Sequence, residues 1–217
     1  MHPLKRISIF FGLCLLIYAA LVVPWPGVMD GYRAFFRAAG NVLFRRFGDA
    51  GAVTFQPLSS VDHSKDTTVI LLKRRPPSAK GEMDITAVYT GYRPTVFFIA
   101  LALATPIPWS RRWKALVLGL LLVNAFVALR VWLRILDAFS DGNPLALYSF
   151  SPFWKEVLKF VVKVLVLAPA VHYAAPAFIW LVVAFRRDDL TRLFNYPPAE
   201  PVAAARARHK RRRHRPA

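Results

Sequence analysis

Four long apolar blocks constrain the fold of this 217-residue chain more than any other feature. They cover residues 7–23, 85–108 (or 94–108, after an Arg-Pro pair), 115–136 and 157–185. A strand of a globular protein is usually about 5–6 residues long, whereas an α-helix needs about 20 apolar residues to cross a membrane. We therefore predict an all-α integral membrane bundle of four transmembrane helices, with a small α+β extracytoplasmic segment between the first two.

Composition supports a membrane protein over two other classes. Apolar residues make up 56% of the chain, and the formal charge is +18. A disordered basic protein lacks this apolar content. Cys14 is the single cysteine, which excludes a disulfide framework. The first block is followed by Pro24, Trp25 and Pro26 rather than a small-residue cleavage site, so it is predicted to be an uncleaved anchor.

Basic residues flank the apolar blocks on one side of a four-span arrangement. They lie before the first block, between the second and third, and after the fourth, which places both termini in the cytoplasm of a multi-pass protein. The predicted organisation is an N-terminal anchor helix (1–26), an extracytoplasmic segment (27–84), a three-helix membrane core (85–185) and a basic cytoplasmic tail (186–217).

The extracytoplasmic segment carries its own patterns. Apolar residues recur at helical spacing over 28–47, which predicts an amphipathic helix lying in the membrane interface. Three β-prone runs follow, at 53–55, 67–72 and 83–89, separated by proline and glycine. We expect a small sheet on the outer membrane surface.

Ionisable residues inside apolar blocks are costly and mark either a bundle interior or a snorkelling side chain. Arg130 and Arg134 lie four residues apart on the third block, hence on one helix face. Lys159 and Lys163 share a face near the outer end of the fourth and are expected to reach water. His172 lies deeper, between two prolines, and is either a packing residue or a polar contact within the bundle.

These positions carry a family resemblance. The run from Val88 to Arg93 reads Val-Tyr-Thr-Gly-Tyr-Arg; an apolar helix, a basic turn, a helix with Asn124 and Arg130, and a later helix with His172 follow. Over about 86–185 this arrangement resembles the exosortase and archaeosortase family. Those proteins are multi-span enzymes of the cytoplasmic membrane that cleave C-terminal sorting signals with a Cys nucleophile, an Arg and a His.

The resemblance implies a site and a location. Matching Tyr89, Arg130 and His172 to the family's catalytic positions predicts that they face one pocket open to the outer leaflet of a bacterial inner membrane. Antiparallel helices would bring Arg130 and His172 to similar depth. The surrounding substrate or partner pocket would comprise these residues: Thr90, Gly91, Arg93, Asn124 and Arg134.

Two departures bear on function. Tyr89 stands where the family has its Cys, and a phenol cannot supply the thiolate needed for acyl transfer. Asn124 lies six residues before Arg130, whereas the family more often has it three before. Cys14 is a poor substitute, because it lies in the middle of the first apolar block.

The leading hypothesis is a non-catalytic, exosortase-like membrane component of a protein-sorting system, a pseudoenzyme that assists a separate exosortase and contacts a protein bearing a sorting signal. One alternative is an active membrane peptidase or transpeptidase with Tyr89 or water as nucleophile. Another is an unrelated membrane scaffold or transport subunit, which alone predicts that Tyr89, Arg130 and His172 lie far apart.

Other chemistry has little support in the sequence. There is no glycine-rich phosphate loop and no His/Cys spacing typical of a metal site, so neither a cofactor nor a metal is predicted. Residues 62–64 (Asp-His-Ser) are interpreted as a polar turn. The tail lacks the interleaved aromatic residues of a nucleic-acid site, and its basic residues are expected to bind anionic lipids: Arg206, Arg208, Lys210, Arg211, Arg212, Arg213 and Arg215.

Overall fold

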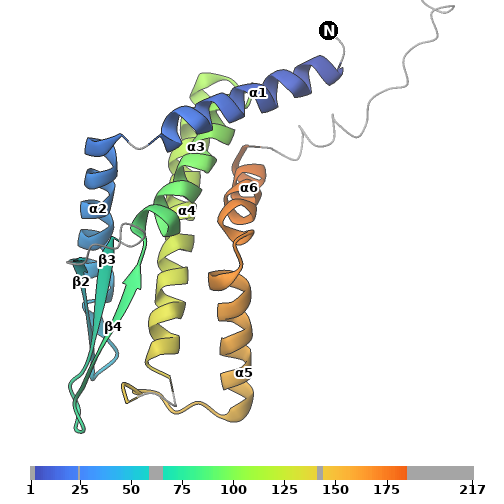
Figure 1. Cartoon of the computed structure of the whole chain (residues 1–217). Coiled ribbons are helices and arrows are strands. Elements are labelled where there is room, and N and C mark those ends of the chain that lie inside the picture. Colours follow the sequence, from blue (N-terminus) through green and yellow to red (C-terminus); the bar gives the residue numbers. More distant parts are fainter. Residues whose placement is uncertain (1–2, 24, 59–65, 141–143, 185–217) are drawn as a thin grey trace, which may run out of the picture. The chain divides into compact units, whose positions relative to one another are not determined.

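The computed structural model describes residues 3–23, 25–58, 66–140 and 144–184 (Figure 1). Two helices come first, four strands follow, and the rest of this part of the chain is helical. Their order is α1 (Pro3–Val22), α2 (Pro26–Phe44), β1 (Arg46–Phe47), β2 (Gly51–Pro57), β3 (Thr67–Lys73), β4 (Ala79–Ile85), the π-helix η1 (Val88–Tyr92), α3 (Arg93–Ala104), α4 (Trp109–Ala138), α5 (Pro152–Val161), the π-helix η2 (Val162–Leu167) and α6 (Val171–Ala184).

The strands form one antiparallel meander in the order β1-β2-β3-β4. In this sheet Val53 lies opposite Leu71, and Val69 opposite Met83. Side chains of a strand alternate between the two faces of a sheet. Val69 and Leu71 on β3, like Val53 and Phe55 on β2, are buried, while the residues between them are more exposed. One face of the sheet is therefore apolar and needs a covering layer.

Helices α2 and α4 cover that face. Phe36 and Phe44 of α2 and a stripe of α4 residues share one hydrophobic cluster with Val53, Phe55, Val69 and Leu71 of the sheet. The stripe recurs every four residues along the second half of α4 and continues just beyond it: Val127, Val131, Ile135 and Phe139. The second half of α4 is thus buried by the sheet and by α2.

The prediction of an all-α bundle of four transmembrane helices is wrong. The protein is mixed α/β, with a four-stranded antiparallel sheet built into its main core. Within the described residues, α4 is the one helix that is long and apolar enough by itself to cross a membrane. The number of candidate spans reaches three at most, if α1 with α2, and α5–η2 with α6, are each counted as one bent span.

Two of the predicted spans fail for local reasons. The second block forms an apolar helix only over Val88–Ala104, which is shorter than the roughly 20 residues of a typical span. The fourth block is interrupted before Val171, and its two helical parts meet at 82°. Pro169 lies in this break and cannot donate a backbone hydrogen bond, so a continuous helix is not expected there.

Helices α1, α4 and α6 pack around α3. The ring of Phe98 on α3 lies directly against Gly119 of α4, where a Cβ atom would collide with it. The Trp180 indole of α6 donates a 2.8 Å hydrogen bond to the hydroxyl of Thr105. Cys14 is buried in this region among residues of α1, α3 and α6.

The predictions of individual elements are more accurate than the prediction of the overall fold. The runs at 53–55 and 67–72 lie within β2 and β3, and the amphipathic helix predicted over 28–47 corresponds to α2. The third run does not extend to 89 as a strand: β4 ends at Ile85, and Tyr89 lies in η1. Part of the apolar face of α2 packs against β2, so that face does not lie wholly in a membrane interface.

Candidate functional site

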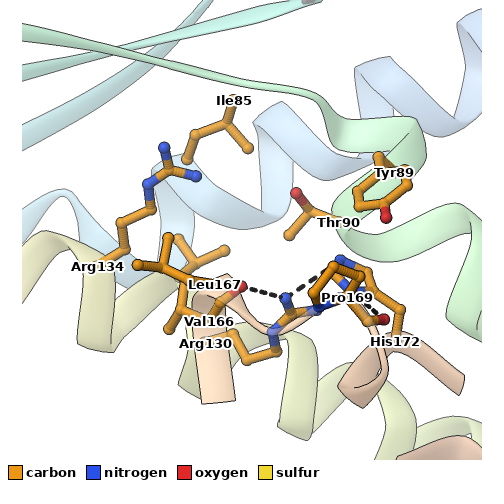
Figure 2. A pocket seen from close by; sticks show the side chains of 10 residues that line it. Ile85, Tyr89, Thr90, Arg130, Arg134, Val166, Leu167, Pro169 and His172 are labelled. Atoms are coloured by element: carbon orange, nitrogen blue, oxygen red, sulfur yellow. Dashed lines mark hydrogen bonds between the residues drawn. The ribbon is translucent and has the colours of Figure 1, made fainter. Parts of the chain in front are cut away.

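One pocket lies where the starts of η1 and α6, the second half of α4 and the break after η2 come together (Figure 2). Its cavity volume is about 160 Å³. Its lining contains two arginines, a histidine, a tyrosine and a threonine beside apolar residues: Ile85, Tyr89, Thr90, Arg130, Val131, Arg134, Val166, Leu167, Pro169 and His172. The three residues that the family resemblance singled out, Tyr89, Arg130 and His172, therefore share one pocket.

Arg130 is the most buried charged residue of this site, at 3% exposure. Its Nε donates a 2.8 Å hydrogen bond to the carbonyl of Leu165, and its Nη2 donates one of 2.8 Å to the carbonyl of Val166. These carbonyls lie in the last turn before the break, and a helix end leaves such acceptors unpaired. The cation also lies at the carbonyl end of a helix, where the helix dipole favours positive charge. Arg130 thus acts as a side-chain cap of η2.

His172 has a defined tautomer because of its two neighbours. Its Nε2 lies 3.1 Å from Nη2 of Arg130, and its Nδ1 lies 3.2 Å from the carbonyl oxygen of Pro169. A guanidinium can only donate hydrogen bonds, so Nε2 must accept and the ring proton must be on Nδ1, which donates to Pro169. The imidazole is therefore neutral in this arrangement, and its Nε2 lone pair is engaged.

Tyr89 contacts His172 through its ring rather than through its hydroxyl. The ring centroids of the two side chains are 4.4 Å apart, at an interplanar angle of 54°. On the Tyr89 ring also lies the guanidinium of Arg93, with Cζ 5.0 Å from the centroid. Within the described part of the chain, no side chain hydrogen-bonds to the Tyr89 hydroxyl. Tyr89 is 37% exposed, so it forms the outer wall of the pocket.

A largely buried carboxylate, that of Asp66, fixes the turn that carries Tyr89. Asp66 accepts hydrogen bonds from the backbone N–H groups of Ala87 (2.7 Å) and Val88 (3.3 Å) at the start of η1. The Thr67 hydroxyl also donates to it at 2.9 Å, and Nε of Arg33 lies 3.6 Å from it. The first N–H groups of a helix have no internal acceptors, and a negative charge there is favoured by the helix dipole. Asp66 therefore positions Tyr89 without touching the pocket.

The other predicted pocket residues divide into two groups. Thr90 and Arg134 line the cavity. Gly91 does not, because it faces Tyr32, whose hydroxyl would collide with a Cβ atom at this position. Asn124 lies in a separate apolar groove between α2 and α4, and its Nδ2 donates to the carbonyl of Leu120 at 2.8 Å. The departure of Asn124 from the family spacing is thus matched by a different location.

The charge of the pocket is one-sided. Arg130 and Arg134 line it, Arg93 lies beside Tyr89, and no aspartate or glutamate is among the lining residues. Nη1 of Arg130 is buried and has no hydrogen-bond partner in the described structure. Among the described residues no group of three His, Cys, Asp or Glu side chains could hold a metal ion. The chemistry available here is donation of hydrogen bonds to an anionic or carbonyl oxygen.

Several sequence predictions fall elsewhere. Lys159 and Lys163 are exposed on α5 and η2, and Lys159 pairs with Glu156 at 3.0 Å. The tail residues 206–215 and the turn at 62–64 lie outside the described residues.

Sequence reasoning missed the positioning role of Asp66. The one available signal was an acidic residue just before β3. Because β4 pairs antiparallel with β3, its last residue lies opposite Thr67, next to Asp66, but spacing alone does not reveal this. No family model, curated protein or solved structure matches this chain.

Proposed function

We propose that this protein is a non-catalytic, exosortase-like component of a bacterial membrane protein-sorting system that assists a separate exosortase. The observation that carries the proposal is the meeting of Tyr89, Arg130 and His172 in one pocket, from three helical segments distant in sequence. This juxtaposition was expected from the resemblance. An unrelated scaffold or transport subunit gave no reason to expect it.

The absence of a nucleophile supports a non-catalytic role. The residue at the Cys position is Tyr89, whose ring contacts His172 and Arg93, and its hydroxyl has no hydrogen-bonded base among the described residues. A general base must reach the proton it removes through a hydrogen bond. Nε2 of His172 accepts from Arg130 instead, so an active enzyme using Tyr89 as nucleophile is the weaker alternative.

Membrane association is part of the proposal. Helix α4 has the length and composition of a transmembrane span, and basic residues flank its start at Arg111, Arg112 and Lys114. By the positive-inside rule this end is cytoplasmic, and the sheet and the pocket lie at the opposite end of α4. The pocket would therefore open on the outer side, where sorting signals are cleaved in the family that the chain resembles.

The test pairs the full-length chain with an exosortase that has its Cys and a reporter protein with a C-terminal sorting signal. We expect co-purification with the exosortase and a fall in reporter processing when the chain is deleted. With the exosortase absent, the wild-type chain should leave the reporter intact, as should Tyr89→Cys. Processing by the wild-type chain alone would show an active enzyme. Unchanged processing on deletion, without co-purification, would refute the assisting role.

A further inference from the structure

The depth of the pocket along α4 can be worked out from its tryptophans. Trp109 and Trp113 at its start and Trp132 near its end are exposed, at 66%, 61% and 41%, and tryptophan favours the membrane–water interface. The inner pair, Trp113 and Trp132, is separated by about 28 Å of helix at about 1.5 Å per residue, close to the roughly 30 Å of a hydrocarbon core. The large exposed hydrophobic side chains of α4 between them are Val117, Leu118, Leu121, Leu122 and Leu129. Arg130 lies two residues from Trp132, hence at the level of the lipid headgroups.

The positive charge of the pocket at this depth is not paired with an anion from the lining residues. Arg130 is 3% exposed, and three of its contacts are neutral: two carbonyl oxygens and the neutral imidazole of His172. Its Nη1 remains buried without a partner, and Arg134 adds a second positive charge to the lining. A buried charge is favourable only when it is paired and its donors are satisfied. A bound oxyanion would supply both conditions.

The rim of the pocket is suited to a lipid. Leu167 lines the cavity and is 63% exposed, and Val164, one turn earlier on η2, is 40% exposed. A ligand whose anionic group enters the cavity would therefore meet apolar surface at its edge. The cavity of about 160 Å³ has room for one compact oxyanion, and the apolar chains would have to stay outside.

We propose that this pocket binds the phosphate of an anionic phospholipid headgroup, with Nη1 of Arg130 as the buried donor, Arg134 as the second cation and the acyl chains along Leu167 and Val164. A zwitterionic headgroup brings its own cation toward Arg134 and Arg93 and binds more weakly. This site goes beyond the sorting role and does not rest on it, since it needs no exosortase and no sorting signal.

The test uses the purified full-length chain in a neutral detergent. Dioctanoyl phosphatidylglycerol, dioctanoyl phosphatidylcholine, inorganic phosphate and a peptide with a free C-terminal carboxylate are titrated separately, and the shift of the thermal unfolding midpoint gives each affinity. We expect phosphatidylglycerol to bind best. Arg134→Gln should weaken it about tenfold, the loss of one charge-assisted contact of about 1.4 kcal/mol. Arg130→Gln should abolish binding, and Arg134→Gln keeps the test valid if Arg130→Gln does not fold.

The control is Lys114→Gln, which removes an exposed cation at the other end of α4 and so measures general electrostatic attraction to headgroups. It should change the affinity by less than about twofold, as expected for an exposed charge. Equal losses in Lys114→Gln and Arg134→Gln would refute a specific site. Inorganic phosphate binding as tightly as the lipid would overturn the lipid source, and tighter binding of the peptide would assign the pocket to a carboxylate instead.

Discussion

Removing the carboxylate of Asp66 should loosen the helix start that carries Tyr89. Asp66→Ala leaves the N–H groups of Ala87 and Val88 without their acceptor. Losing a helix-capping side chain costs about 1 kcal/mol, and a buried donor left unsatisfied costs about 1–3 kcal/mol. Because Ala87 is 0% exposed, water cannot easily replace the lost acceptor. We expect a loss of about 3 kcal/mol in the free energy of unfolding.

The assay is equilibrium unfolding of the purified chain in mixed micelles, with hydrogen exchange of the Ala87 and Val88 amides as a local readout. Asp30→Ala is the matched control, since Asp30 also pairs with Arg33 (2.9 Å) but is 71% exposed and caps no helix. Exposed ion pairs contribute about 0–1 kcal/mol, so the control should lie within that range. A cost of Asp66→Ala equal to that of Asp30→Ala, with unchanged amide protection, would refute the capping argument.

Two further predictions concern α4. Gly119→Ala should lower the unfolding free energy by about 1–3 kcal/mol, because its Cβ would overlap the ring of Phe98. The control Gly12→Ala has open space around its Cβ and should be neutral or stabilising. Thermal melts of both variants in detergent test the difference, and equal melting midpoints would contradict the packing argument. In a cysteine-free background, Ser149→Cys should react with a membrane-impermeant maleimide in intact cells while Ser110→Cys should not, because α4 separates the two exposed positions. Equal labelling would exclude α4 as a span.

The sequence predicts the strands and α2 because alternating and helical patterns are local properties. It does not reveal what covers an apolar helix. Val127 and Val131 look the same in the sequence as Leu121 and Leu122, yet the first pair is buried against the sheet and the second pair is exposed. Counting apolar residues therefore assigned to lipid a half of α4 that packs in a protein core. The four-span bundle itself failed because the second block forms only a short helix and the fourth is broken before Val171.

The candidate site shows the same division between local and long-range information. The meeting of Arg130 and His172 was predicted from the family resemblance and is observed. The supporting depth argument assumed an unbroken fourth helix, whereas the two parts of that block meet at 82°. The cap from Asp66 could not, because it joins positions 21 residues apart through a hydrogen bond rather than a pattern. The sequence predicts that some carbonyls before Pro169 lack a helical partner, because proline has no N–H to donate. That Arg130 pairs with these carbonyls could be seen only in the tertiary structure.

The break at Pro169 also changes what the presence of Arg130 and His172 implies. Arg130 satisfies the carbonyls of Leu165 and Val166, and His172 satisfies that of Pro169, so both residues have a structural role whether or not the protein catalyses a reaction. Their presence alone is therefore no evidence for an enzyme. Tyr89 has no comparable bond among the described residues, which leaves its position free to vary without loss of the fold. In the proposed non-catalytic component, the Arg/His pair would be kept because it caps the helix break, whereas the third residue of the pocket would be under no such constraint.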